Sequence, residues 1–194
     1  MPQHNICVFC ASSLGGDPSY SRLATEVGAA IAESGLGLVY GGASIGLMGK
    51  VADAALENGG QVTGVIPDGL RSRELNHKGL TELLITEDMH ERKRIMYERS
   101  DGFLALPGGM GTLEEVFESA TWTKLGFHKG RKNKPVILVG SSSFWSPLTS
   151  FLDMLVEEEL MKASDRAIVS YQKNPKDAVG QLLTLFSTHN ELEQ

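Results

Sequence analysis

Short apolar segments that alternate with longer segments of helical spacing constrain the fold of this chain more than any other feature. The apolar segments, expected as strands, are Asn5–Ala11, Leu36–Tyr40, Gln61–Ile66, Leu83–Thr86, Gly102–Leu106, Pro135–Val139 and a stretch near Ala167–Tyr171. The expected helices are Pro18–Ser34, Leu47–Asn58, Asp88–Ser100, Thr112–Leu125, Pro147–Leu160 and Pro175–Phe186. Short apolar strands separated by helices are typical of a parallel sheet covered on both faces. We therefore predict an α/β fold, a Rossmann-like doubly wound parallel sheet with helices on both faces.

Length and charge limit the classes of protein to which the chain can belong. Its 194 residues correspond to one domain, because domains commonly contain roughly 100–200 residues. We expect a single α/β domain over residues 1–194, with a polar tail from about residue 188. A net charge of −6 argues against nucleic-acid binding, which favours a basic face. No apolar run reaches the roughly 20 residues of a membrane span, and the polar N-terminus does not resemble a signal peptide. We expect a cytoplasmic protein that binds neither nucleic acid nor membrane.

The two cysteines, Cys7 and Cys10, form a C-x-x-C pattern inside an expected strand. Successive strand side chains point to opposite faces, so an offset of three separates the two sulfur atoms. We expect two buried thiols in a reducing compartment rather than a metal or redox pair. The sequence shows neither a second cysteine pair nor an H-x-x-x-H pattern, and we predict that the protein uses no metal and no cofactor.

Three loops have the position expected of a ligand site, which in doubly wound folds lies outside the carboxyl ends of the strands. They are Ala11–Asp17, Gly41–Gly49 and Pro107–Thr112. The second is not a Walker A loop, because Ser44 replaces its first glycine and Val51 replaces its Ser/Thr. Its glycines either admit a ligand or permit close packing of helix on strand, and the sequence does not decide between these two interpretations.

The third loop, with the sequence PGGMGTLEE at 107–115, is not a dinucleotide fingerprint either. Glu114 stands where the last glycine of G-x-G-x-x-G belongs. Glycines between a strand and a helix let backbone N–H groups face an anion, and the helix dipole adds about half a positive charge there. A tight turn is the alternative, with Thr112 as N-cap and Glu115 closing a T-x-x-E capping box. It leaves three glycines and a proline in five positions unexplained, so we predict a site for one phosphate group.

PGGMGTLEE, preceded by MHERK at 89–93, resembles the signature of the Lonely Guy (LOG) family of cytokinin riboside 5′-monophosphate phosphoribohydrolases. FCASS at 9–13 and YGGASIGLMG at 40–49 match the same family, and the resemblance covers roughly residues 6–171. It implies hydrolysis of the N-glycosidic bond of an N6-substituted AMP, releasing the free base and ribose 5-phosphate. It also implies a homodimer. Members often carry the label lysine decarboxylase, but that chemistry needs an electron sink such as pyridoxal phosphate, and no lysine here has a recognisable context for one.

The resemblance also implies roles for individual residues. Arg92 and Glu115 become the catalytic pair, while Gly109, Gly111 and Thr112 hold the 5′-phosphate. The remaining substrate-binding residues are Gly108, Met110, Leu113 and Glu114 of the loop, together with Glu74, Lys93 and Thr121. A carboxylate near the ribose suits an oxocarbenium-like transition state. Arg92 suits charge stabilisation better than proton donation, because its pKa exceeds about 12.

Plainer interpretations stand beside these assignments. Arg92 and Lys93 fit a solvated helix face that pairs with Glu91 or Glu98. Three of the five histidines, His77, His90 and His128, fit surface or capping roles, and the polar segment Asp68–Gly79 fits a surface loop as well as a lid. Two other functions remain open: a broader N-glycosidase acting on AMP or a deoxynucleotide, and a carrier of nucleotides without catalysis. Glu115 argues against a carrier, which gains nothing from a carboxylate at the ribose.

Overall fold

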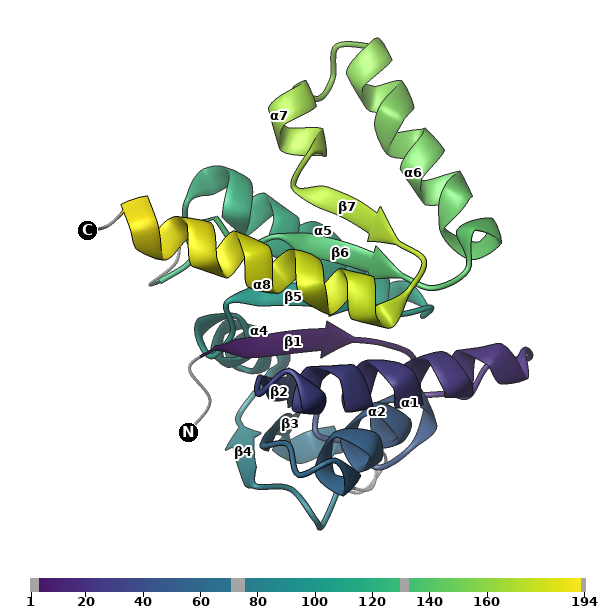
Figure 1. Ribbon diagram of the computed structural model, residues 1–194, viewed down its shortest axis with the longest axis vertical. Coiled ribbons are helices and arrows are strands. Elements are labelled where there is room, and N and C mark those ends of the chain that lie inside the picture. Colours follow the sequence, from purple (N-terminus) through teal and green to yellow (C-terminus); the bar gives the residue numbers. More distant parts are fainter. Residues whose placement is uncertain (1–3, 71–75, 130–132, 193–194) are drawn as a thin grey trace.

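A computed structural model describes residues 4–70, 76–129 and 133–192. The strands of these residues are β1 (Asn5–Phe9), β2 (Gly37–Tyr40), β3 (Val62–Pro67), β4 (Glu82–Thr86), β5 (Gly102–Ala105), β6 (Val136–Val139) and β7 (Val169–Gln172). The helices are α1 (Pro18–Glu33), α2 (Gly46–Glu57), α4 (Met89–Glu98), α5 (Met110–Leu125), α6 (Ser142–Glu157), α7 (Ala163–Arg166) and α8 (Pro175–Leu192), with a 3-10 turn η1 (Asp68–Leu70). They alternate with the strands along the chain, as the sequence predicted (Figure 1).

The described strands form one parallel sheet in the order β4-β3-β2-β1-β5-β6-β7. From β1 the chain runs outward through β2, β3 and β4, and then returns to place β5 on the other side of β1. The direction of winding therefore reverses between β1 and β5, where Val8 pairs with Leu104. The predicted doubly wound parallel sheet is confirmed, and this reversal is where such sheets bind ligands.

Two apolar cores lie on opposite faces of the sheet. One face is covered by α1, α2 and α8, which are nearest the viewer in Figure 1. The other is covered by residues of α4, α5 and α6, including Tyr97, Val116 and Trp145. Cys10 belongs to the first core and Cys7 to the second, and both thiols are free and buried. The expected separation of the two sulfurs is thus confirmed, and burial raises the pKa of both thiols.

Helix boundaries differ most from the sequence expectation at two positions. We expected a helix to begin at Pro147, but α6 begins at Ser142 and contains the proline. Trp145 explains the earlier start, because it is fully buried and its indole N–H donates to the Val139 carbonyl at 3.0 Å. At the other end of the chain, α8 continues past the expected end at Phe186 to Leu192.

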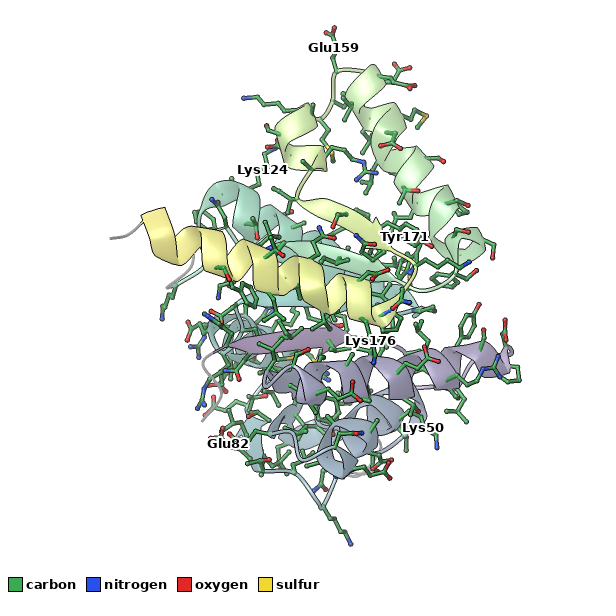
Figure 2. All side chains as sticks on the ribbon, in the orientation of Figure 1. Lys50, Glu82, Lys124, Glu159, Tyr171 and Lys176 are labelled. Atoms are coloured by element: carbon green, nitrogen blue, oxygen red, sulfur yellow. The ribbon has the colours of Figure 1, made fainter. Side chains whose placement is uncertain are left out.

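The short helix α7 was not expected from the sequence, since four residues are too few to show helical spacing. The turn before it contains Glu159, whose φ of 58° is left-handed, at the tip beyond α6 (Figure 2). No helix among the described residues is both long enough and apolar enough to cross a membrane.

Candidate active site

A cavity of about 360 Å³ opens at the carboxyl ends of β1 and β5, where the winding reverses. Its lining comes from segments that are far apart in the sequence: residues 8–13, Gly41, Met48, Leu70, Met89, Arg92, Met96, 109–112, Glu114 and Glu115. All three loops singled out in the sequence therefore contribute residues to one cavity, as the position of ligand sites in this fold class predicts.

The first turn of α5 forms one wall of this cavity. Gly109 is the N-cap, and the first three helical residues are Met110, Gly111 and Thr112. The first N–H groups of a helix have no partners within the helix and carry its positive dipole end. This turn is therefore suited to bind an anion. The capping-box interpretation is wrong, because Thr112 is the third residue of the helix. The N-cap is Gly109, which makes no side-chain capping hydrogen bond.

The glycines of this turn are not equally required by packing. A Cβ on Gly108 would lie 2.1 Å from the hydroxyl oxygen of Thr112, so close packing explains that glycine. A Cβ on Gly109 or Gly111 would meet no atom of the described residues within 4 Å. A tight turn therefore accounts for Gly108 alone, while Gly109 and Gly111 leave open space beside the helix N-terminus.

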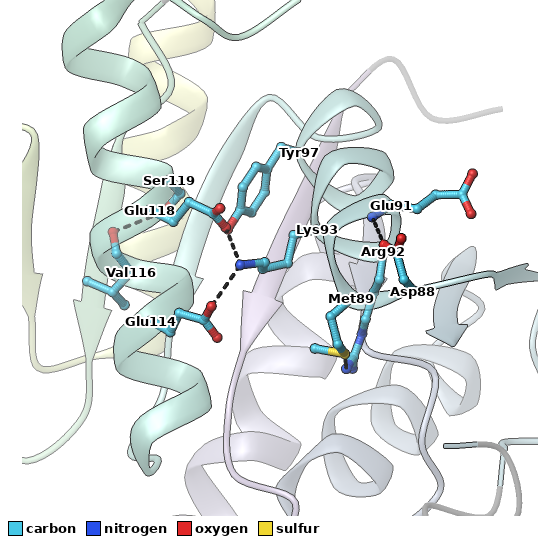
Figure 3. Close-up of polar contacts among 10 residues, drawn as sticks. All are labelled: Asp88, Met89, Glu91, Arg92, Lys93, Tyr97, Glu114, Val116, Glu118 and Ser119. Atoms are coloured by element: carbon cyan, nitrogen blue, oxygen red, sulfur yellow. Dashed lines mark hydrogen bonds and ion pairs between the residues drawn. The ribbon is translucent and has the colours of Figure 1, made fainter. Parts of the chain in front are cut away.

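Arg92 lies on α4 and is only 6% exposed, so the solvated-face interpretation does not hold for it. Its Nη2 donates to the Gly41 carbonyl oxygen at 3.0 Å, and its Nη1 lies 3.7 Å from the sulfur of Met89 (Figure 3). The buried Nε has no hydrogen-bond partner among the residues that the structure describes. Arg92 thus lines the cavity with both terminal nitrogens of its guanidinium in contact with neighbouring residues.

Lys93 is buried as well but does not line the cavity. Its Nζ lies 2.8 Å from Glu114 and 3.0 Å from Glu118, and Glu118 also accepts a hydrogen bond from Tyr97 at 2.7 Å (Figure 3). Burial lowers the pKa of Lys93, but the hydrogen bonds to the two carboxylates outweigh it and the pKa is raised. Lys93 therefore fastens α4 to α5, while Arg94 makes the surface pairs with Glu91 and Glu98.

Glu115 lies one helical turn beyond Gly111, partly buried, and faces the same cavity as Arg92. Burial raises the pKa of its carboxyl group from the ordinary 4.5 to about 7. The nearby charge of Arg92 opposes that shift, whereas Glu114 adds to it. A carboxyl group with a pKa near neutrality can accept and release a proton at physiological pH, and this one shares its cavity with a fixed cation.

The other residues implied by the family resemblance lie in different places. Leu113 and Gly108 flank the cavity-lining turn, and Glu74 lies outside the described residues. Thr121 is exposed and lines a separate cavity of about 230 Å³ with Phe117 and Leu125. It cannot reach the first cavity of its own chain, because it lies about 14 Å further along α5 than Thr112.

The three histidines discussed from the sequence do not line the cavity. His90 is exposed, and His77 pairs with Asp53 at 2.9 Å. His128 is buried instead of exposed; its Nε2 lies 3.1 Å from the Ser119 carbonyl, and burial lowers its pKa to about 4. Among the residues that the structure describes, no three His, Cys, Asp or Glu side chains gather as a metal-binding group.

Sequence reasoning missed the apolar part of the cavity. Met48, Met89, Met96 and Leu70 line it, although none of them was named as a site residue. Their apolar character predicts a core position equally well, and only Met48 and Met89 lie inside motifs that the sequence had already singled out.

Comparison with known proteins agrees with this geometry. The family model described as "Possible lysine decarboxylase" matches residues 48–182. The cytokinin riboside 5′-monophosphate phosphoribohydrolase of Rhodococcoides fascians is 44% identical over 179 residues, which cover 92% of this chain and 88% of that protein. One from Arabidopsis thaliana is 41% identical over 187 residues, 96% of this chain and 86% of that protein.

Among solved structures, a molybdenum cofactor carrier protein from Chlamydomonas reinhardtii superposes with a TM-score of 0.69. The match covers 94% of this chain and 99% of that one, at 24% identity, so it shows a shared fold and nothing further. The identities above 40% with the phosphoribohydrolases extend over nearly the whole chain. The chain therefore belongs to the Lonely Guy (LOG) family of cytokinin riboside 5′-monophosphate phosphoribohydrolases.

Proposed function

We propose that this protein hydrolyses the N-glycosidic bond of AMP-type nucleoside 5′-monophosphates that carry a substituent on N6, releasing the free base and ribose 5-phosphate. One observation carries the proposal: Arg92, Glu115 and the first turn of α5 line a single cavity. A helix N-terminus for the phosphate, a carboxylate and a guanidinium are the groups that this reaction needs.

The 5′-phosphate binds at the first turn of α5. Gly109 and Gly111 leave room for it, and the hydroxyl of Thr112 is available as a further donor. Hydrogen bonds to charged groups contribute about 1.5–3 kcal/mol each. With the phosphate fixed there, the ribose lies towards Glu115, one helical turn further along α5.

Cleavage breaks the C1′–N9 bond, and the bonding electrons leave with the base. A water molecule adds its oxygen to C1′ and loses a proton. The ionised carboxylate of Glu115 stabilises the oxocarbenium-like sugar and accepts that proton. Arg92 stabilises the negative charge on the departing base, for which a permanently protonated guanidinium is suited. The base anion then takes up a proton from water and Glu115 releases its own, so the neutral base leaves and the carboxylate is restored.

The apolar wall receives the base and its N6 substituent. Met48, Met89 and Met96 line that part of the cavity. Unbranched thioether side chains adapt to different apolar shapes, so we expect the wall to accept more than one N6 substituent. Lys93 takes no part as a Schiff-base lysine, because its ammonium group is held by Glu114 and Glu118.

Release of free base from N6-isopentenyl-AMP and from AMP, measured side by side, tests this proposal. We expect base and ribose 5-phosphate in equal amounts, with the N6-substituted nucleotide cleaved faster. Equal rates on both nucleotides favour the broader N-glycosidase. Binding of either nucleotide without any base release indicates a nucleotide carrier and contradicts the proposal.

The exposed face of α5 supports a homodimer. Met110, Phe117 and Leu125 are exposed apolar side chains on this helix, and Phe151 and Met154 are exposed on α6. Contiguous exposed apolar residues are typical of association surfaces. A dimer formed through this face places the exposed Thr121 at the interface instead of in the cavity of its own chain.

Sedimentation analysis of Phe117→Glu tests the dimer. We expect the variant to shift to the mass of a monomer, because a charge in an apolar interface is costly. Leu185→Glu changes a similarly exposed residue on α8, on the other side of the sheet, and serves as the control. A wild-type protein that sediments as a monomer rules the dimer out.

A further inference from the structure

The guanidinium of Arg92 occupies the space that a side chain at position 41 requires. A Cβ built on Gly41 would lie 2.1 Å from Nη2 of Arg92 and 3.3 Å from its Cζ. The carbonyl oxygen of the same glycine accepts the hydrogen bond from Nη2 at 3.0 Å. Gly41 therefore provides both the room and the acceptor for the guanidinium.

The backbone at this position does not itself require glycine. Gly42, the next residue, has a φ of 78°, which favours glycine, but Gly41 is not among the glycines with positive φ. Gly41 also follows β2 directly, at the carboxyl edge of the sheet. Contact with Arg92, and not the path of the chain, accounts for the missing side chain.

The atoms that crowd position 41 belong to the ends of flexible side chains. Besides Arg92, the sulfur of Met48 would lie 2.9 Å from the added Cβ. Gly28 presents the opposite case, because its Cβ would lie 2.2 Å from the backbone carbonyl oxygen of Val51. Alanine at position 41 is therefore accommodated by moving Arg92, whereas alanine at position 28 forces the backbone of two packed helices apart.

The hydrogen bonding of Arg92 indicates why its place matters. Nη2 donates to Gly41 and Nη1 contacts the sulfur of Met89, while the buried Nε–H has no partner within the described part of the chain. Buried polar groups are nearly always hydrogen-bonded in folded proteins. Arg92 lines the cavity with its guanidinium held at Gly41 and Met89, so the position that the guanidinium takes towards a ligand depends on these two contacts.

We propose that Gly41 is a positioning residue for the catalytic arginine: its missing side chain and its carbonyl oxygen hold the Arg92 guanidinium in place for the substrate. The inference rests on the proposed function, since Gly41 acts through Arg92. It gives part of the Gly41–Gly49 loop a role in the reaction although Gly41 has no side chain of its own.

A double-mutant cycle tests it with four proteins: wild type, Gly41→Ala, Arg92→Ala and the double variant. Small misplacements of a catalytic group cost up to about 10²-fold. We expect Gly41→Ala to lower kcat for base release from N6-isopentenyl-AMP by about tenfold to a hundredfold. In the Arg92→Ala background the same change leaves kcat unaltered within about twofold, because coupled residues are not additive. AMP affinity, measured by calorimetry on the same four proteins, decides the cycle where the Arg92→Ala rate is too low to compare.

Two other glycine variants separate positioning from folding. Gly180→Ala lies on α8 with open space around it and should behave as wild type. Gly28→Ala should lower the Tm while each folded molecule stays active. Gly41→Ala should keep a Tm close to that of wild type but lose activity. A Gly41→Ala protein with wild-type kcat, or with the same loss in both backgrounds, overturns this inference alone. An Arg92→Ala protein with wild-type base release removes the catalytic assignment of Arg92 itself.

Discussion

The two glycine-rich loops of the cavity use glycine for different physical reasons. In the Gly41–Gly49 loop, a Cβ on Gly46 would lie 2.2 Å from the backbone of Ser12, and one on Gly49 would lie 2.2 Å from the carbonyl oxygen of Ser44 in the same loop. In the Pro107–Thr112 loop, a Cβ on Gly109 or Gly111 would meet nothing within 4 Å among the described residues. The first pair of glycines serves close packing, and the second pair leaves space for a ligand.

The first loop also shows why one interpretation of a glycine motif can be incomplete. Its sequence left ligand binding and close packing equally open, and the structure assigns both roles within ten residues. Gly46 and Gly49 permit close packing, while Gly41 and Met48 line the cavity. A motif can therefore contribute to a site through single positions and to the fold through the rest.

The largest expected effect lies one turn beyond the second loop. Glu115→Gln keeps the shape of the side chain but removes the negative charge. Loss of one such electrostatic contribution typically lowers the rate by about 10² to 10³. We expect base release to fall by that factor, while AMP still binds and the Tm is no lower than that of wild type. A stable and fully active variant would transfer the catalytic role to another carboxylate.

Substituting alanine for one glycine in each loop tests the packing role of the first loop and the ligand-binding role of the second separately. Gly49→Ala forces a Cβ against the carbonyl oxygen of Ser44 and should destabilise the fold by about 1–3 kcal/mol, as overpacking does. Gly111→Ala meets open space and should leave stability unchanged or improved, because alanine is the better helix residue. The new methyl group stands where we propose that the phosphate binds, so we expect KM to rise about tenfold, the loss of roughly one hydrogen bond.

Thermal denaturation and steady-state kinetics on both variants decide the matter. If Gly111→Ala unfolds easily and Gly49→Ala raises KM alone, the two loops have been assigned the wrong way round.

A smaller effect should appear in the pH dependence of the rate. Burial raises the pKa of Glu115 to about 7, and the proposed reaction uses its ionised form. We expect kcat/KM for the nucleotide to fall as the pH drops through about 7, with the residual rate of Glu115→Gln lacking this step. A wild-type rate that is flat over this range contradicts the role of the carboxylate.

The free energy of unfolding should also depend on the ionisation of Glu115, but it should fall, and not rise, as the pH increases. The pKa of Glu115 is higher in the folded protein than its ordinary value of 4.5, so the folded state holds the proton more tightly. Its contribution to stability is full below about pH 4.5 and is lost as the pH rises through about 7. Glu115→Gln should therefore gain Tm relative to wild type on going from acid to mildly alkaline buffer. A Tm difference that does not change with pH is the contrary result.

The sequence predicted most of the fold because its strands are short, apolar and bounded by glycine or proline. It placed the start of α5 at Thr112 and not at Met110, because Gly-Gly-Met-Gly has no helical periodicity. It placed the start of α6 at Pro147, because proline usually marks a first turn and the burial of Trp145 is a tertiary effect.

The site was predictable only where chemistry and motif coincided. Arg92 and Glu115 were named through the family resemblance, and both line the cavity. The sequence did not show that Lys93 lies outside it, because adjacent residues of a charged helix look alike until their partners are known. The role of Gly41 depends on contact with a residue 51 positions away, which no local pattern reveals.

Cleavage of a nucleoside 5′-monophosphate against cleavage of its riboside tests the central claim most directly. The first turn of α5 is assigned to the phosphate, and without it two or three charge-assisted hydrogen bonds of about 1.5–3 kcal/mol each are lost. We predict that kcat/KM for N6-isopentenyl-AMP exceeds that for N6-isopentenyladenosine by at least about a hundredfold. Equal kcat/KM for the two substrates would contradict the phosphate site, and with it the account of the Pro107–Thr112 loop.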